Sequence, residues 1–410
     1  MTCSDIVVWG ATGFTGRLVA EYLLDRYGVD GDLRWAIGGR NPAKLKQIRA
    51  ELGGAAESLP ILIGDSNDPA SLDKFLPNTA VVCSTVGPFA QYGTELVAAC
   101  VRHGTHYCDL SGEVHWMQRM IDTYQRQAQE SDARIVHACG FDSIPSDLGC
   151  LLINQVMRER HGQPCHEVKL RVRKMKGTFS GGTFASMLNA LEEAKHDPVA
   201  RRALGNPYAL NPEGARSGPD GPDQQVPAWD VDIRTWTAPF VMASINTRVV
   251  RRSNALMNNA YGSHFRYSEA VTMGTGPLGL AKATALTAAL GGFLLSTSFR
   301  PSRALLNKWL FPQPGEGPSR EQREQGYFEI ILIGKHPEDA SLDLRAKVTA
   351  DRDPGYGATC KMLGESAVCL AKDTDALNVG GGFWTPASSM GTQLIERLKA
   401  NAGMTFELTE

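Results

Sequence analysis

A glycine-rich turn lies ten residues from the start of the chain, directly after a short apolar run at 5–9. The turn reads Gly10-Ala-Thr-Gly-Phe-Thr-Gly16, and an amphipathic segment follows it. In a strand–turn–helix unit, glycines let the backbone approach a phosphate closely, and the first turn of the helix offers free N–H groups. The segment therefore predicts a site for a dinucleotide pyrophosphate, with a purely structural turn as the alternative. The residues expected to contact the cofactor are Gly10, Thr12, Gly13, Phe14, Thr15 and Gly16.

The residues after the second predicted strand, at 34–38, bear on the choice of cofactor. An NAD site usually has Asp or Glu about 20 residues beyond the glycine turn, where the carboxylate binds the ribose 2′-hydroxyl. This chain has Arg40 there instead, with Lys44 one helical turn later. Because a guanidinium can bind a 2′-phosphate through two hydrogen bonds, the pattern favours NADP(H), although a solvated surface Arg is the alternative. Asp65 follows the third strand and is either an acceptor for the adenine amino group or a turn residue.

A second loop of interest follows the fourth predicted strand, at 80–84. A Gly-Pro turn at the carboxyl end of a parallel strand would border the nicotinamide ribose. Phe89 or Tyr92 could flank the ring and the Tyr92 hydroxyl could donate a proton, although both aromatic side chains could simply pack. The loop residues assigned to the cofactor are Ser84, Val86, Gly87, Pro88 and Phe89.

Hydrophobic periodicity divides the chain into three parts. Short apolar runs alternate with helical patterns over 1–145, which predicts a doubly wound parallel sheet of the Rossmann type, an α/β architecture. Residues 146–354 predict an antiparallel α+β domain for substrate binding or dimerisation, with a long Pro- and Gly-rich loop at 197–227. Residues 355–410 predict C-terminal helices that pack back on the first domain.

Charge and cysteine usage exclude several classes of function. The chain has 42 basic and 44 acidic residues, so it lacks the basic surplus typical of nucleic-acid-binding domains. Its nine cysteines contain no CxxC pair, and its nine histidines show no ligand spacing with acids or thiols. We therefore expect no metal site and a reducing, cytoplasmic environment.

Several motifs together resemble the saccharopine dehydrogenase-like oxidoreductases. The segments that carry the resemblance are 10–16, 86–93, 109–113 and 140–149. Further segments are similar to the branch that includes the mycobacterial trans-acting enoyl reductases, namely 180–183, 251–254, 353–358, 385–390 and 403–407. The resemblance implies a Rossmann domain, a saccharopine-reductase-like second domain, and reduction of a lipid-linked substrate by NADPH. It assigns no catalytic residue.

Enoyl reduction needs a proton donor and hydrogen bonds to the developing oxyanion. Tyr92, Asp142 and Ser143 are the catalytic candidates, because they lie in loops expected at the carboxyl ends of strands four and six. Asp142 and Ser143 could instead cap the following helix, as could Asp109 and Glu113 for theirs.

Candidate substrate contacts lie further along the chain. Arg251 and Arg252, beside Asn254, could bind a carboxylate or the phosphate of a carrier-linked substrate, with an exposed strand end as the alternative. The segment 180–183 could form a second anion-binding turn or only a helix cap.

We therefore expect an NADPH-dependent oxidoreductase that reduces an enoyl or other unsaturated acyl substrate. Two alternatives remain open, a saccharopine-type amino-acid oxidoreductase and a non-catalytic NADP-binding scaffold at lipid membranes. Short-chain dehydrogenases are unlike this chain, because no tyrosine has a lysine four residues later.

The stretch 283–299 contains seventeen uncharged residues. It is shorter than the roughly 20 residues of a spanning helix. A span, an interfacial helix or hairpin at the inner face of a membrane, and a buried core or partner surface, such as that of a homodimer, all remain open.

Overall fold

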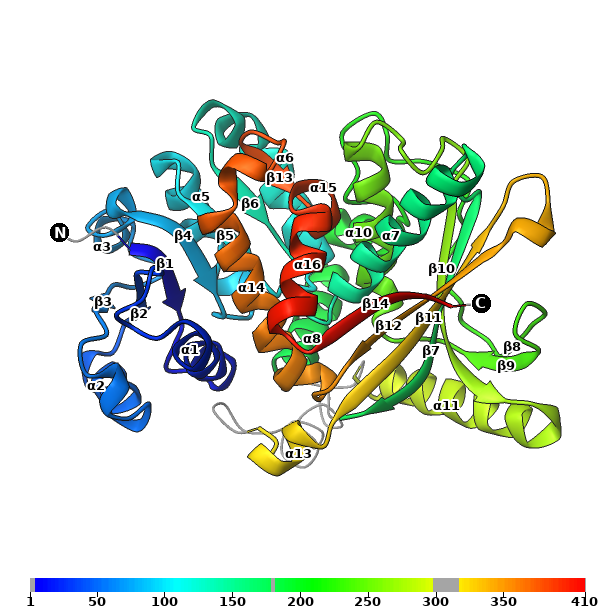
Figure 1. Ribbon diagram of the computed structural model, residues 1–410, viewed down its shortest axis with the longest axis horizontal. Coiled ribbons are helices and arrows are strands. Elements are labelled where there is room, and N and C mark those ends of the chain that lie inside the picture. The colour runs from blue at the N-terminus through cyan, green and yellow to red at the C-terminus, as the bar shows by residue number, and fades with distance from the viewer. Residues whose placement is uncertain (1–3, 178–180, 298–316, 410) are drawn as a thin grey trace.

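The structure, a computed structural model, describes residues 4–177, 181–297 and 317–409. Two seven-stranded sheets stand side by side, and the helices α7, α10, α14 and α16 lie between them (Figure 1). These helices are α7 (Ile144–His161), α10 (Ala243–Leu256), α14 (Thr359–Lys372) and α16 (Gly391–Asn401). The arrangement places the carboxyl ends of the first sheet's strands next to the second sheet's helices.

The first sheet is parallel throughout, in the order β13-β6-β5-β4-β1-β2-β3. Its strands are β1 (Ser4–Trp9), β2 (Trp35–Gly39), β3 (Ile61–Ile63), β4 (Thr79–Ser84), β5 (His106–Asp109), β6 (Arg134–Val136) and β13 (Gly382–Trp384). The helices between these strands are α1 (Phe14–Tyr27), α2 (Pro42–Glu51), α3 (Pro69–Leu72), α4 (Phe89–Tyr92), α5 (Thr94–His103) and α6 (Val114–Glu130). The predicted Rossmann arrangement is confirmed. The continuous apolar run of β1 is buried because helices cover both faces of a parallel sheet.

The second sheet is mixed, in the order β14-β12-β11-β7-β10-β9-β8. Its strands are β7 (Glu167–Lys176), β8 (Ala228–Asp230), β9 (Thr235–Ala238), β10 (Arg266–Gly274), β11 (Tyr327–Lys335), β12 (Leu344–Ala350) and β14 (Met404–Thr409). The remaining helices are α8 (Gly181–His196), α9 (Pro198–Gly205), α11 (Gly276–Thr297), α13 (Arg320–Glu324) and α15 (Pro386–Ser389). The expectation of a purely antiparallel sheet is wrong at one pair, since β7 and β10 run parallel.

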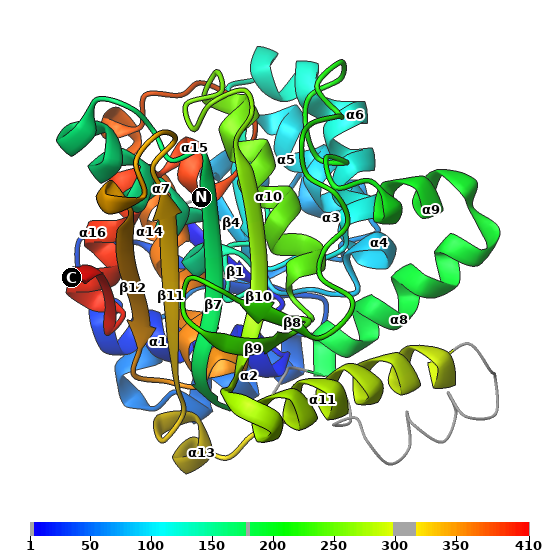
Figure 2. The same cartoon turned by 90° about the vertical axis from the view of Figure 1, so that its right-hand side faces the viewer.

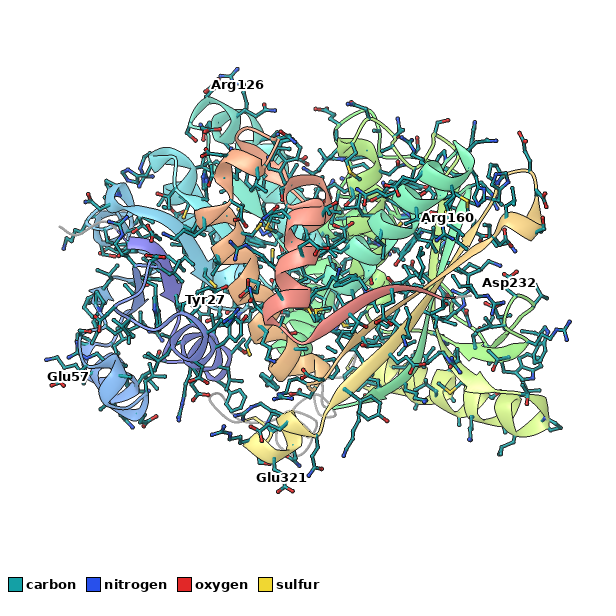
Figure 3. All side chains as sticks on the ribbon, in the orientation of Figure 1. Tyr27, Glu57, Arg126, Arg160, Asp232 and Glu321 are labelled. Carbon is teal, nitrogen blue, oxygen red and sulfur yellow. The ribbon has the colours of Figure 1, made fainter. Side chains whose placement is uncertain are left out.

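The C-terminal segment 355–410 belongs to both sheets. Its strand β13 extends the first sheet beside β6, and β14 forms the edge of the second sheet beside β12. Helix α14 packs against α1, where the hydroxyls of Tyr22 and Tyr27 each donate to Glu365 Oε1 at 2.6 Å (Figure 3 labels Tyr27). The two strands were not expected from the sequence, and they join the two halves of the molecule into one unit.

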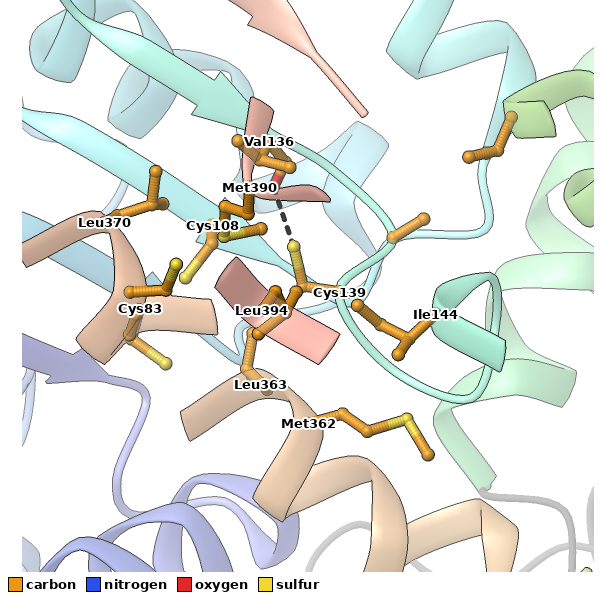
Figure 4. Packing of buried hydrophobic residues seen from close by; sticks show 14 of the residues in the cluster. Cys83, Cys108, Val136, Cys139, Ile144, Met362, Leu363, Leu370, Met390 and Leu394 are labelled. Atoms are coloured by element: carbon orange, nitrogen blue, oxygen red, sulfur yellow. Dashed lines mark hydrogen bonds between the residues drawn. The ribbon is translucent and has the colours of Figure 1, made fainter. Parts of the chain in front are cut away.

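Buried thiols fill part of the core behind the first sheet. Cys83 and Cys108 are free cysteines that lie opposite each other on the neighbouring strands β4 and β5. The thiol of Cys139 donates to the Val136 carbonyl at 3.5 Å (Figure 4). Burial raises the pKa of the Cys108 and Cys139 thiols well above its usual value. These cysteines are therefore protonated and act as small hydrophobic side chains.

The Pro- and Gly-rich segment 197–227 was predicted to be a loop, and this is wrong for its first part. Asp197 caps α9 by accepting from the Val199 N–H at 2.7 Å, and a proline occupies the first helical turn. The rest is irregular but attached to the core, because Leu210 is fully buried and Asp220 binds Arg251.

Candidate functional site

The glycine turn lies between the carboxyl end of β1 and the start of α1, and it leaves no room for side chains. Gly10 has φ +89°, which favours glycine, and a Cβ there would lie 2.6 Å from Val86 Cγ2. A Cβ on Gly16 would lie 2.7 Å from Thr85 Oγ1. The first turn of α1 has no acidic residue, and its N-cap residue, Gly13, forms no side-chain cap. The uncapped N–H groups in the first turn of α1 fit a pyrophosphate.

The side chains predicted to select the cofactor lie at the end of β2. Arg40 and Lys44 are both exposed, and neither forms an ion pair with another residue in the described part of the chain. Their positive charges are thus free for a 2′-phosphate. Asp65 follows β3, and its Oδ1 accepts from the Asn67 N–H at 3.0 Å, which is the turn role left open by the sequence.

The two aromatic residues of the loop after β4, Phe89 and Tyr92, differ from each other in burial. Phe89 is buried and packs on Trp116, with ring centroids 5.6 Å apart, so the expectation that it flanks the nicotinamide is wrong. Tyr92 is half-buried at the end of α4. Of the predicted loop residues, Val86 lies against Gly10 and Ser84 pairs with Trp9, which precedes the turn, whereas no contact joins Gly87 or Pro88 to the turn in the described part of the chain.

Glu113 is a buried carboxylate that holds this loop. It precedes α6, but instead of capping that helix it accepts from the backbone N–H groups of Phe89 and Ala90 at 2.7 and 2.9 Å. The hydroxyl of Ser186, in α8, donates to the same carboxylate at 2.7 Å. The expected helix-capping role was therefore assigned to the wrong helix, and Glu113 ties α4 to α8.

Asp109 also differs from its expected capping role. It is fully buried at the end of β5, where its Oδ2 lies 2.8 Å from Nδ1 of His137 and accepts from the Tyr107 hydroxyl at 3.0 Å. Its Oδ1 accepts from the Ser111 N–H at 3.0 Å. His137 was not singled out from the sequence, because nothing local to it signals a partner 28 residues away.

Asp142 lies in the loop after β6, between glycines of two strand ends. A Cβ on Gly140 would lie 3.1 Å from Asp142 Oδ2, and one on Gly112 would lie 4.0 Å from Oδ1. The side chain is only 9% exposed. Burial, together with the nearby charge of Asp109, raises the pKa of Asp142 to about 7. The carboxyl group therefore carries a proton in a large share of molecules at neutral pH.

Ser143 starts α7 but forms no cap with its side chain, so the capping alternative is wrong for it. Its hydroxyl donates to Asn246 Oδ1 at 3.2 Å, and the Asn246 amide donates to Glu269 Oε2 at 2.9 Å. The Tyr267 hydroxyl donates to the other oxygen of Glu269 at 2.8 Å, and burial raises the pKa of Glu269 to about 7. The structure thus places a buried polar network, not visible in the sequence, behind Ser143.

Arg251, Arg252 and Asn254 lie on α10 and are buried, so both the substrate role and the exposed strand end were wrong for them. Arg251 binds Asp220 at 2.7 Å and donates to the Pro207 and Tyr267 carbonyls at 3.1 Å. Arg252 donates to the carbonyls of Leu210 and Phe383, and the Asn254 amide donates to the Gly262 carbonyl at 2.9 Å. These polar groups are engaged by Asp220 and by the protein's own backbone, apart from Arg252 Nε, which is buried with no partner among the described residues.

Two further expectations concern anion and metal binding. The predicted turn at 180–183 falls partly outside the described residues, and Gly181 begins α8. Within the described ranges, no cluster of three His, Cys, Asp or Glu residues could hold a metal ion.

A glycine cradle, an adjacent arginine and a doubly wound sheet define a Rossmann oxidoreductase that uses NADP(H). Residues 6–136 match the family model of the saccharopine dehydrogenase NADP binding domain. A Mycobacterium tuberculosis protein with the provisional name trans-acting enoyl reductase is 43% identical over 415 residues, which cover 99% of this chain and 97% of that protein. The trans-acting enoyl reductase of Mycobacterium ulcerans is 37% identical over 410 residues and 95% of its length.

Among solved structures, the saccharopine dehydrogenase (L-Glu forming) of Saccharomyces cerevisiae has the same fold. It matches with a TM-score of 0.54 and 12% identity over 99% of both chains. The chain therefore belongs to the saccharopine dehydrogenase-like family of NADP-dependent oxidoreductases, in the group that contains the trans-acting enoyl reductases.

Proposed function

We propose that this protein reduces the carbon–carbon double bond of a lipid-linked enoyl substrate with NADPH. The similarity to trans-acting enoyl reductases over nearly the whole chain supports the reaction class. The observation that carries the chemistry is the position of Asp142, a buried carboxyl group with its pKa raised to about 7 by burial, at the carboxyl edge of the first sheet, where ligands bind in such folds.

The reaction adds a hydride to the β-carbon and a proton to the α-carbon of the enoyl group. When bound, the reduced nicotinamide supplies the hydride. Asp142 holds a proton at neutral pH and can transfer it to the α-carbon, after which its carboxylate regains a proton from water. The half-buried Tyr92 hydroxyl can donate a hydrogen bond to the oxyanion that develops on the thioester carbonyl.

The structure weighs against the two alternatives. A saccharopine-type enzyme would need a carboxylate-binding group in the site, but Arg251 and Arg252 are engaged by Asp220 and by backbone carbonyls. A non-catalytic scaffold would need no proton donor at the strand ends, whereas Asp142 and Tyr92 both lie there.

The test is oxidation of NADPH by the purified protein in the presence of enoyl thioesters of increasing chain length. The reaction is monitored as the loss of absorbance of the reduced nicotinamide. We expect D142N to abolish most turnover while it preserves NADPH affinity. D147N is the matched control, because Asp147 is also buried with its pKa raised to about 7 by burial, but its carboxylate is occupied by hydrogen bonds from the Ser253 hydroxyl and the Ala387 N–H. An absence of enoyl-dependent oxidation at every chain length, or equal rates in D142N and wild type, would refute the proposal.

The role of Tyr92 has its own test. Tyr92→Phe is expected to lower turnover several-fold without changing NADPH affinity, because only the hydroxyl is removed. An unchanged rate would mean that the ring only packs.

A further inference from the structure

Helix α11 has a single charged residue, Lys282, and most of the helix is exposed. It is the one helix in the described part of the chain that is long and apolar enough to cross a membrane. Over Gly276–Ser296 its mean hydropathy reaches 1.6, and only 11% of that window is buried within the molecule. Leu278 and Leu295, near its two ends, are each 68% exposed. Of the alternatives left open for 283–299, a buried core is therefore wrong for the part that the structure describes.

The helix is attached to the second sheet by its first turns. It lies across one end of that sheet and extends past it (Figure 2), in contact with β9 and β10. Gly279 makes the close approach possible, because a Cβ there would lie 2.5 Å from the Gly274 carbonyl carbon and 3.3 Å from the Trp236 ring. Ala283, one turn later, is fully buried. The sheet thus holds α11 along its edge and presents the opposite side of the helix outward.

Two tryptophans lie beside the start of α11. Trp229 and Trp236 face each other across β8 and β9 in a T-shaped pair, with centroids 5.6 Å apart, and Trp229 is 43% exposed. Val231, in the turn of the hairpin, is 70% exposed. Exposed Trp beside an apolar segment is typical of surfaces at the level of lipid headgroups, because the ring is apolar and its N–H is polar.

The hairpin that carries these residues is firmly held, and its acidic residues are neutralised. Asp230 binds Arg171 at 2.7 Å, and Asp232 binds Lys169 and Lys335 at 2.6 and 2.9 Å (Figure 3 labels Asp232). The exposed tryptophan is therefore part of a rigid surface.

The charges of this surface favour an anionic partner. From residue 233 to residue 296 the only acidic residue is Glu269, which is buried behind Ser143. Arg234, next to β9, and Lys282, the only charged residue of α11, are both exposed. In the described residues of α11 and the β8–β9 hairpin the exposed charges are cations only, and together with the exposed apolar side chains they match a membrane that contains anionic lipids.

We propose that α11 and the β8–β9 hairpin form a lipid-binding surface that inserts into the headgroup region of an anionic bilayer, with α11 parallel to the membrane. A second copy of the chain fits less well, because a symmetric interface would bring the exposed cations Arg234 and Lys282 of both copies together with no exposed carboxylate of α11 or the hairpin to neutralise them. A membrane span would require α11 to detach from β9 and β10. The proposal does not depend on the enzymatic reaction, since the surface is remote from the glycine turn (Figure 1).

The experiment is flotation of the full-length protein with vesicles of phosphatidylcholine, alone or with 30% phosphatidylglycerol. We expect binding that phosphatidylglycerol strengthens and salt weakens. The double variant L278E/L295E should lower the bound fraction at least tenfold, whereas the control V199E, at a position 58% exposed on α9, should bind as wild type does. Unchanged NADPH affinity and thermal unfolding would show that the variants fold.

Results of three kinds would overturn the proposal. The first is no vesicle binding by the wild type, or equal losses in L278E/L295E and V199E. The second is a dimer in light scattering that L278E/L295E converts to monomers without any vesicle binding, which would assign the surface to a second copy. The third is membrane-bound protein that resists alkaline carbonate, which would show a span.

Discussion

The raised pKa of Asp142 predicts how the substitution Asp142→Asn changes the unfolding free energy, and this prediction can be tested without a substrate. The pKa of Asp142 is raised from an ordinary 3.8 to about 7, chiefly by burial. Between these values the unfolded chain has lost this proton and the folded protein keeps it, so stability falls as the pH rises. Each pKa unit corresponds to about 1.4 kcal/mol, so a rise of about three units lowers the unfolding free energy by up to roughly 4 kcal/mol above pH 7. Below about pH 4 the carboxyl group is protonated in both states, and the unfolding free energy is unaffected.

Asparagine is neutral at every pH, so Asp142→Asn removes this cost. Urea unfolding followed by tryptophan fluorescence should therefore show the variant close to wild type at pH 4.5 and more stable at pH 8.5, by about 2–4 kcal/mol. In both proteins stability still falls with rising pH because of Asp147 and Glu269, whose pKa values are also raised to about 7 by burial. Parallel pH dependences for variant and wild type would refute the assignment of a raised pKa to Asp142. Greater stability together with lost turnover would separate a catalytic role from a structural one.

Three further predictions concern the cofactor site and the core. Arg40→Asp should weaken NADPH binding about 10- to 100-fold in a fluorescence titration and leave NADH binding nearly unchanged, because a charge-assisted pair contributes about 1.5–3 kcal/mol; equal losses would contradict a 2′-phosphate contact. Gly16→Ala should weaken binding of both cofactors at least tenfold, since its Cβ would lie 2.8 Å from the Gly10 carbonyl carbon, and unaltered titrations would show that the turn can adjust. Arg251→Met should lower the unfolding free energy by about 3–5 kcal/mol, because it leaves the Asp220 carboxylate buried and unpaired, with NADPH affinity preserved where the variant is folded. A stability within 1 kcal/mol of wild type would mean that water replaces the guanidinium.

Most of the first domain could be predicted from the sequence because its signals are local. The strand, the glycine turn and the helix follow one another within 27 residues, and the family model confirms the NADP-binding prediction. The absence of an acidic residue near Arg40 is likewise a short-range observation. Strand β7 also carries a local signal, because its apolar and basic residues alternate as expected for a half-exposed strand.

The errors concern contacts between residues that are distant in the chain. Phe89 was assigned to the cofactor, but it packs against Trp116. Glu113 was expected to cap the helix that follows it, but it caps α4, which precedes it by more than twenty residues. Arg251 belongs to the core because Asp220 arrives from the irregular segment before β8. Such pairings depend on how elements pack, which hydrophobic periodicity does not specify.

The sequence by itself determined the Rossmann domain, the cofactor and the apolar character of 283–299, since each depends on the order of neighbouring residues. Tertiary structure decided the electrostatics of the site and the exposure of α11. Ser143 meets Asn246 across 103 residues, and the pKa of Asp142 rises because segments after β5 and β6 enclose it together. Burial depends on all the elements packed around a group, so the same carboxyl group in an isolated loop would titrate at its ordinary value.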